Sequence, residues 1–327
     1  MDVLNVAVMA PALGPDLSYV SAVDPRVRVI DANRAGDELD AALAVADVFL
    51  VGYPVPPVVV GRAPHLTWAH HTQAGVSNLH KSDLWTSPVT LTSSRGVVSA
   101  AAIAEYVLAA AAFVARGLHE GARQKQAGLF TRSGYDMVSL RDATMGVVGL
   151  GGIGQEVARQ ATGLGMRVLA TRRSVAAPAR DTDGVDWLLP ADQLHQMAAQ
   201  SDFLAVCAQL TAETTGMIDA VALAALKPGA VLINVARGEE VDEDALVEAL
   251  VSGNLRAAVL DVYDGELAGR PPRPELLELP QVLLTPHISG RGDPESREPI
   301  RRLFADNLCR FLLGEPLLNV VDRQRGY

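Results

Sequence analysis

Three residues with complementary chemistry follow apolar segments in the second half of the chain. Arg237 comes after the segment VLINV, Glu266 after AAVLDV and His287 after VLLT. Short apolar segments of this kind are typical of buried strands in a parallel sheet, and the carboxyl ends of such strands lie along one edge where ligands bind. We therefore expect the three side chains to lie together although they are distant in sequence.

This set of side chains fits hydride transfer to a 2-oxo acid. The planar guanidinium of Arg237 can bind a substrate carboxylate with two hydrogen bonds. A histidine ionises near neutral pH, so His287 can donate a proton to a carbonyl oxygen, and the carboxylate of Glu266 can orient the imidazole ring. Taken singly, the three have ordinary explanations as a turn arginine, an exposed loop acid and a strand-end histidine. The prediction depends on their joint occurrence.

A glycine-rich turn precedes these residues in sequence. Residues 145–173 read as a strand, a turn with Gly149, Gly151 and Gly154 in the GxGxxG spacing, a helix and a second strand. The glycines allow a tight turn, a close approach of the backbone to a pyrophosphate and close packing of helix on strand. The pattern predicts a dinucleotide-binding site; the alternative is a purely structural glycine turn.

The end of the second strand bears on the coenzyme. NAD sites usually place an acidic residue there for the ribose 2′-hydroxyl. This chain instead has Thr171, Arg172, Arg173 and Ser174. Guanidinium and hydroxyl groups suit a 2′-phosphate, so we expect NADP, with NAD as the alternative coenzyme. The competing explanation is a pair of solvated arginines.

Composition narrows the class of protein. The chain has 327 residues, 49% hydrophobic and 20% charged residues and a formal net charge of -10. This charge argues against binding to nucleic acid or to an anionic membrane. Two cysteines, Cys207 and Cys309, provide no disulfide framework, and the adjacent His70 and His71 lack further ligands at metal-binding spacing, so we expect no metal. The opening MDVLNVAVM enters an expected strand directly, and we expect a cytoplasmic protein without a signal peptide.

Alternating strand and helix patterns predict an α/β fold built from two doubly wound parallel sheets. The expected strands of the first series are residues 5–9, 27–30, 48–51, 66–69 and 89–92. An alanine-rich helix over residues 100–116 and an irregular stretch through Tyr135 separate the two series. The expected strands after the glycine turn are residues 203–207, 231–235, 257–262 and 282–285. Asp242 is expected to cap one helix, and Gly314 to end another over residues 300–313.

Taken in order, these motifs resemble those of the D-isomer-specific 2-hydroxyacid dehydrogenases over nearly the whole chain. The resemblance depends on SSRGVVSAAAIAEYVL, GLGGIGQEVA, KPGAVLINVARGEEVDEDALVEAL, LDVYDGE and LLTPHISG. The pattern is most similar to the branch of NADPH-dependent glyoxylate/hydroxypyruvate reductases. The resemblance implies a Rossmann cofactor domain, residues 98–289, inserted in a flavodoxin-like substrate domain, residues 1–97 and 290–327. It also implies a homodimer in which the alanine-rich helix supplies much of the interface.

The same resemblance implies roles for individual residues. Arg237 would bind and polarise the substrate, His287 would be the acid in reduction, and Glu266 would be its partner. The loop HHTQAGVSNL would hold the substrate carboxylate through the backbone amides of Gly75 and Val76. The coenzyme would contact Gly149, Gly151, Gly152, Ile153, Gly154, Arg172, Arg173, Ser174, Thr215 and Asp261.

Several positions depart from the family pattern and leave the substrate open. Leu267 and Gln209 stand where the family often has proline, Ser77 where it often has aspartate, and Leu277 where the reductase branch often has tryptophan. The sequence predicts an NADPH-dependent oxidoreductase that converts a small 2-oxo acid to a D-2-hydroxy acid, with glyoxylate or hydroxypyruvate favoured. The alternatives are a dehydrogenase of an unusual acid, such as a phosphonate analogue, and a cofactor-sensing interaction protein of the corepressor type.

Overall fold

The computed structural model describes residues 3–33, 36–97, 100–290, 297–324 and 326. The chain divides into two compact units: Met1–Ser99 with Gly292–Tyr327, called unit 1, and Ala100–Arg291, called unit 2. These bounds differ from the expected 97/98 and 289/290 junctions by two residues. The assignment of substrate binding to unit 1 and of coenzyme binding to unit 2 stays a prediction.

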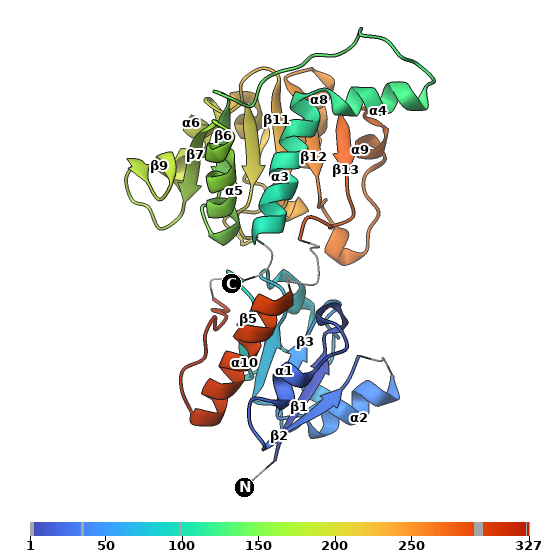
Figure 1. The fold of residues 1–327 in the computed structure, drawn as a ribbon, viewed down its shortest axis with the longest axis vertical. Coiled ribbons are helices and arrows are strands. Elements are labelled where there is room, and N and C mark those ends of the chain that lie inside the picture. Colours follow the sequence, from blue (N-terminus) through green and yellow to red (C-terminus); the bar gives the residue numbers. More distant parts are fainter. Residues whose placement is uncertain (1–2, 34–35, 98–99, 291–296, 325, 327) are drawn as a thin grey trace. The chain divides into compact units, whose positions relative to one another are not determined.

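Unit 1 contains a five-stranded parallel sheet in the order β2-β1-β3-β4-β5 (Figure 1). This is the flavodoxin-like order, in which the chain winds first to one side of β1 and then to the other. The strands are β1 (Leu4–Met9), β2 (Val27–Asp31), β3 (Val48–Val51), β4 (Trp68–His71) and β5 (Thr90–Ser93). The short helices α1 (Ser18–Ser21) and α2 (Asp37–Val45) connect the early strands, and α10 (Glu298–Leu313) returns to this unit from the end of the chain.

The sheet of unit 1 is covered on both faces. Val6 and Val8 contribute to the cluster that includes Phe304 of α10, whereas Ala7 contributes to the cluster on the other face with α2. Phe304 stacks on Trp68 of β4 with 5.3 Å between the ring centroids. Successive residues of a strand point to opposite faces, so a strand that is buried on both sides reads as a continuous apolar run.

Strand β4 runs two residues further than the predicted segment 66–69, through two histidines. His70 is fully buried, and its ring nitrogens lie 2.7 Å from Thr92 Oγ1 and 3.0 Å from Ser94 Oγ. Burial lowers the pKa of His70 to about 3, so the ring is neutral. Because hydroxyl groups satisfy the imidazole inside the sheet, polar residues continue a strand that a hydropathy pattern ends early.

Unit 2 contains an eight-stranded sheet in the order β13-β12-β11-β10-β6-β7-β9-β8. Its strands are β6 (Thr144–Val148), β7 (Arg167–Arg172), β8 (Ala179–Thr182), β9 (Val185–Pro190), β10 (Phe203–Val206), β11 (Ala230–Asn234), β12 (Leu255–Leu260) and β13 (Val282–Leu284). The chain winds from β6 to β7 on one side and later to β10 on the other, so the β6–β10 boundary is the switch point at which doubly wound sheets bind ligands.

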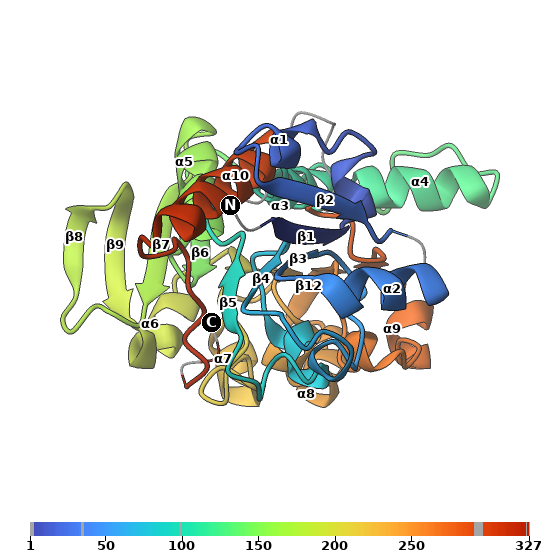
Figure 2. The same cartoon turned by 90° about the horizontal axis from the view of Figure 1, so that it is seen from below.

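One strand of unit 2 departs from the predicted all-parallel sheet. Strand β8 pairs with β9 in antiparallel orientation, and Figure 2 shows this hairpin at the outer edge of the sheet. The chain makes a two-residue turn at Asp183 and Gly184, both with positive φ. Aspartate and glycine at positive φ are typical of a type I′ hairpin turn, so the Asp-Gly pair is a sequence signal for this hairpin.

Helices cover both faces of the sheet in unit 2. Helices α3 (Ala100–Ala115) and α5 (Gly152–Gly163) pack together on one face, and Figure 1 shows them side by side. The other face carries α6 (Leu194–Ala198), α7 (Ala220–Ala225) and α8 (Glu243–Val251). The short helix α9 (Pro274–Glu278) also belongs to this unit.

The stretch after α3 is partly helical rather than irregular. Helix α4 (Leu118–Gln126) begins after Gly117, which has φ 66° and interrupts the helical path. Among the described residues no single helix is long and apolar enough to cross a membrane. Helices α3 and α4 pass that test only as a pair bent by 67°.

The Phe304–Trp68 stack predicts where the terminal helix docks. Phe304→Ala should lower the free energy of unfolding of unit 1 by about 3–5 kcal/mol, because it removes a fully buried aromatic ring and leaves a cavity. Urea unfolding followed by tryptophan fluorescence measures the change. Leu313→Ala, an exposed position on the same helix, is the matched control and should change stability by less than about 0.5 kcal/mol. Equal effects of the two substitutions on stability would contradict the docking of α10 through Phe304.

Candidate active site

Three neighbouring strands of unit 2 end at the same level. Asn234 of β11 pairs with Leu260 of β12, and Leu260 pairs with Leu284 of β13. The loops that carry Arg237, Glu266 and His287 all begin beyond these paired residues. The parallel register therefore brings the starts of the three loops to one edge of the sheet, as predicted from the sequence.

The first two loops contact each other through a glycine. A Cβ atom at Gly238 would overlap the main-chain carbonyl carbon of Tyr263 and the nitrogen of Asp264. Only glycine allows the Arg237 turn to lie this close to the loop that leads to Glu266. The glycine of the Arg-Gly pair is thus explained by close packing of two backbones.

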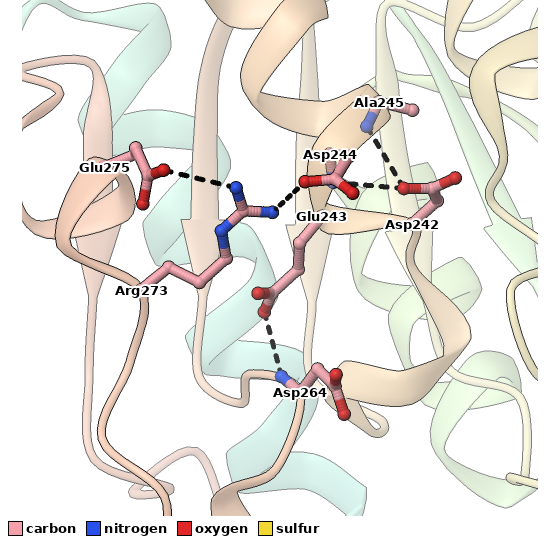
Figure 3. Close-up of polar contacts among 7 residues, drawn as sticks. All are labelled: Asp242, Glu243, Asp244, Ala245, Asp264, Arg273 and Glu275. Atoms are coloured by element: carbon pink, nitrogen blue, oxygen red, sulfur yellow. Dashed lines mark hydrogen bonds and ion pairs between the residues drawn. The ribbon is translucent and has the colours of Figure 1, made fainter.

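The first turn of helix α8 also binds the loop that leads to Glu266 (Figure 3). Glu243 Oε1 accepts a hydrogen bond from the main-chain nitrogen of Asp264 at 2.8 Å. Arg273 binds Asp244 at 2.6 Å and Glu275 at 3.3 Å, and so connects α8 to α9. As predicted, Asp242 caps α8, since its Oδ1 accepts from the nitrogens of Asp244 and Ala245. The start of the helix thereby anchors the segment just before Glu266.

His287 and Glu266 form a direct pair. His287 Nδ1 lies 2.8 Å from Glu266 Oε1. The side chain of His287 is 39% exposed. His287 has φ 52°, and its main-chain nitrogen donates to the carbonyl oxygens of Asp261 and Thr285 at 3.0 Å. A non-glycine residue at positive φ costs energy and is kept where the surrounding bonds determine it.

Asp261 makes several of the hydrogen bonds that hold the segment around His287 in this conformation. Its fully buried carboxylate accepts hydrogen bonds from Thr285 Oγ1 at 2.6 Å and from the nitrogens of Ile288 and Ser289 at 2.8 Å. These donors flank His287 on both sides. The structure thus gives Asp261 a role in positioning the histidine loop, and the expected contact with the coenzyme stays a prediction.

Arg237 is largely buried beside several carboxylates. Burial lowers the pKa of its guanidinium from the ordinary value, and the charges of Glu240, Glu266 and Glu239 act in the opposite direction. Its Nη1 donates to the carbonyl oxygen of Ala236 at 2.6 Å. The negative charges of the neighbouring glutamates favour the charged form of this guanidinium, at the sheet edge that also carries His287.

Glu240 is a buried acid that the sequence analysis did not single out. Its Oε2 accepts from the nitrogen of Arg237 at 3.1 Å, and its Oε1 has no hydrogen-bond partner among the described residues. Burial raises the pKa of Glu240 to about 8 and that of the neighbouring Cys207 thiol to about 12. In the segment RGEEVD two successive acids read as solvated loop residues, and only the fold shows that the second points inward.

The glycine turn has the shape that a dinucleotide requires. Gly149 has φ 91°, and a Cβ there would lie 2.7 Å from Ala208 Cα; at Gly154 a Cβ would overlap the Gly149 carbonyl oxygen. A Cβ at Gly151 would meet no atom within 4 Å, so open space lies before the N-terminus of α5. Gly151 makes no side-chain cap, and the first amides of the helix, including those of Gly152 and Ile153, are available to an anion. The turn therefore fits the pyrophosphate of NAD(P).

Of the other predicted coenzyme residues, Arg172 contacts the glycine turn directly, and Arg173, Ser174 and Thr215 lie in segments that follow β7 or β10. Arg172 Nε donates to the carbonyl oxygen of Leu150, inside the glycine turn, at 3.0 Å. Arg173 and Ser174 follow β7 and are exposed. Thr215 is exposed in a turn after β10, where its hydroxyl donates to the Thr211 carbonyl oxygen at 2.9 Å.

A cavity of about 500 Å³ in unit 2 is not lined by the three predicted catalytic residues. Its lining includes Thr215, Glu239, Asp242, Glu243 and Arg273, but none of Arg237, Glu266 and His287. Several of these groups bind one another, as the pairs around α8 show (Figure 3). We therefore do not assign the substrate to this cavity.

The predicted substrate loop belongs to unit 1 and follows β4. Gly75 and Val76 lie after that strand, and Val76 is buried. His71 Nδ1 lies 3.1 Å from the carbonyl oxygen of Val51, so Nδ1 carries the proton, and Nε2 accepts from Asn78 Nδ2 at 3.0 Å. These bonds give His71 a structural role in holding the loop.

Comparison with known protein families identifies the family of this chain. Residues 108–289 match the model of the D-isomer specific 2-hydroxyacid dehydrogenase, NAD binding domain. The chain belongs to this family. The matched segment contains the glycine turn, Arg237, Glu266 and His287, and lies within unit 2.

Individual relatives carry several names. The glyoxylate reductase of Pyrococcus furiosus is 32% identical over 273 residues, which cover 81% of this chain and 79% of the relative. The D-3-phosphoglycerate dehydrogenase of Mycobacterium leprae is 35% identical over 292 residues, 88% of this chain, but the chain spans only 53% of that relative's length. An NADPH-dependent glyoxylate/hydroxypyruvate reductase from Sinorhizobium meliloti, solved with NADP and sulfate, is 27% identical with a TM-score of 0.78, covering 98% of this chain and 99% of that one.

Burial of Glu240 predicts a pH dependence of stability. Its pKa is about 8 in the folded chain and near 4.5 when the chain unfolds. Between these values the folded chain keeps a proton that the unfolded chain releases, so the free energy of unfolding from this group falls as pH rises, by up to about 1.4 kcal/mol per pH unit. In Glu240→Gln this loss should be absent.

Urea unfolding at pH 5, 6, 7 and 8 checks this. The stability of Glu240→Gln relative to the unmodified chain should increase with pH across the series. The control is Glu239→Gln, the adjacent and less buried acid, whose relative stability should stay flat. Parallel curves for Glu240→Gln and the unmodified chain would contradict the buried, protonated state.

Proposed function

We propose that this chain is an NADPH-dependent reductase that converts a small 2-oxo acid to the D-2-hydroxy acid. Glyoxylate and hydroxypyruvate are the favoured substrates. The observation that carries the proposal is the His287–Glu266 pair at 2.8 Å, at the sheet edge that also holds Arg237 and the glycine turn. The names of the glyoxylate reductase relatives support the substrate class.

Each residue has a defined task in this proposal. Arg237 binds the substrate carboxylate and polarises the neighbouring carbonyl group. The reduced nicotinamide, when bound, supplies a hydride to the carbonyl carbon. His287 donates the proton that converts the carbonyl oxygen to a hydroxyl group, so one C–H and one O–H bond form as the C=O π bond is lost. Glu266 holds Nδ1 of the histidine and stabilises its cationic form before the proton is given up.

We further propose NADPH as the preferred coenzyme, a cytoplasmic location and a homodimer. Arg172 and Arg173 at the end of β7 support the coenzyme, and the two free cysteines suit a reducing compartment. For the dimer, α3 contributes mainly to the core of its own unit. The segment that follows α3 exposes four large apolar side chains among the described residues: Leu118, Leu129, Phe130 and Met137.

The proposed reaction predicts a specific loss in one variant. His287→Gln should lower kcat for 2-oxo acid reduction by about 10²- to 10⁴-fold, because the proton donor is removed, while the Kd for NADPH changes little. A panel of glyoxylate, hydroxypyruvate, pyruvate and phenylpyruvate with NADPH and with NADH separately measures rate, substrate and coenzyme preference. No turnover of any panel acid by the unmodified chain, with NADPH bound tightly, would favour an unusual acid or a cofactor-sensing role instead.

The exposed apolar segment predicts the position of the dimer contact. Phe130→Asp should raise the dimer dissociation constant by about 30-fold or more, because it places a charge at a fully exposed (106%) aromatic residue within that segment. Sedimentation or light scattering over a concentration series gives the constant. Leu313→Asp, another exposed apolar residue but on α10 of unit 1, is the control. A monomeric unmodified chain, or a dimer unaffected by Phe130→Asp, would refute this interface.

A further inference from the structure

Both arginines at the end of β7 have carboxylate partners. Arg172 Nη1 donates to Asp183 Oδ2 at 2.7 Å, and Arg173 Nη1 lies 3.7 Å from Glu213 Oε2. The first pair is a charge-assisted hydrogen bond in which the Arg172 side chain is 27% and the Asp183 side chain 42% exposed, whereas the second pair is longer and more exposed. Only the first has the geometry of a strong interaction.

The position of Asp183 is well defined. It occupies the first place of the two-residue turn between β8 and β9, where both turn residues have positive φ. The hairpin is fixed by the Arg180 guanidinium over the Trp187 ring at 5.0 Å and by Asp186 Oδ2, which accepts from the Val168 nitrogen at 2.7 Å. The carboxylate is thus presented from an anchored turn.

Arg172 is fixed at the coenzyme turn at the same time. Its Nε donates to the carbonyl oxygen of Leu150 between Gly149 and Gly151, and the Gly149 and Leu150 nitrogens in turn donate to the Thr171 carbonyl oxygen at 3.2 and 2.9 Å. The guanidinium therefore stays beside the glycine turn while it binds Asp183. A 2′-phosphate that used this guanidinium would meet the negative charge of Asp183 within a few ångströms.

From this geometry we infer that Asp183 determines coenzyme specificity, because its carboxylate competes with the coenzyme 2′-phosphate for Arg172 and reduces the preference for NADP(H) over NAD(H). The inference rests on the proposed NADP(H) site. It adds a residue that lies on a hairpin outside the β6–α5–β7 nucleotide motif. The expected substrate class and catalytic residues are unaffected by it.

Two nucleotide fragments separate the 2′-phosphate from the rest of the coenzyme. Isothermal titration calorimetry with adenosine 2′,5′-bisphosphate and with 5′-AMP gives two dissociation constants for each variant. Asp183→Asn should tighten binding of the bisphosphate by about five- to tenfold, because a neutral amide competes with the phosphate for the Arg172 guanidinium less strongly than a carboxylate does. Binding of 5′-AMP should change by less than twofold. Asparagine before glycine suits the same turn, so the hairpin is kept.

Matched variants identify the cause. Asp181→Asn removes the same charge from an exposed position on β8 that makes no ion pair among the described residues, and should leave both constants unchanged. In an Arg172→Ala background, Asp183→Asn should no longer tighten the bisphosphate, since the competition requires the guanidinium.

The outcomes distinguish this inference from the proposed coenzyme. An unchanged bisphosphate constant in Asp183→Asn, or equal changes for both fragments, would overturn the inference alone, provided that Arg172→Ala weakens the bisphosphate selectively. If Arg172→Ala leaves the ratio of the two constants as it is in the unmodified chain, the proposed 2′-phosphate site is wrong, and the role of Asp183 is wrong with it.

Discussion

The candidate site depends on the alignment of three parallel strands whose last residues, Asn234, Leu260 and Leu284, pair across the sheet. The hydrogen-bonded register of the parallel ladders fixes the level at which these strands end relative to one another. The loops that follow these strands therefore start close together, and short paths bring a cation, an acid and an imidazole to one edge of the sheet. Gly238 allows close contact between the backbones of two of these loops. The buried carboxylate of Asp261 binds the loop around His287.

Charge is distributed unevenly over this edge. Burial lowers the pKa of Arg237 and raises that of Glu240, and the charges of nearby glutamates oppose the effect on Arg237. On the other side of the switch point, Arg172 is shared between the glycine turn and Asp183. The end of the sheet thus carries two cationic groups that feel the charge of acids in the same unit. An anionic ligand at either group has to compete with charges that are already present.

Much of this was predictable from the sequence, because strand periodicity and glycine spacing report backbone geometry directly. The series of strands, the turn at Gly149 and the juxtaposition of His287 with Glu266 follow from such patterns. The inward direction of Glu240 was not predictable, since burial of a loop acid depends on residues far along the chain. The pairing of Asp183 with Arg172 was missed for a related reason: the Asp-Gly turn was readable, but the reach of its side chain depends on how β8 and β9 twist at the edge of the sheet. Strand β4 continued past its predicted end because buried hydroxyl groups accommodate His70.

The bonds made by Asp261 have one more consequence. Two of its three donors are main-chain amides, those of Ile288 and Ser289, which every amino acid except proline possesses. The exposed side chain of Ile288 can therefore vary during evolution or in a designed library without loss of this hydrogen bond beside the histidine. Such variation would change the surface next to the His287 imidazole while the main-chain hydrogen bonds keep the histidine in the same orientation.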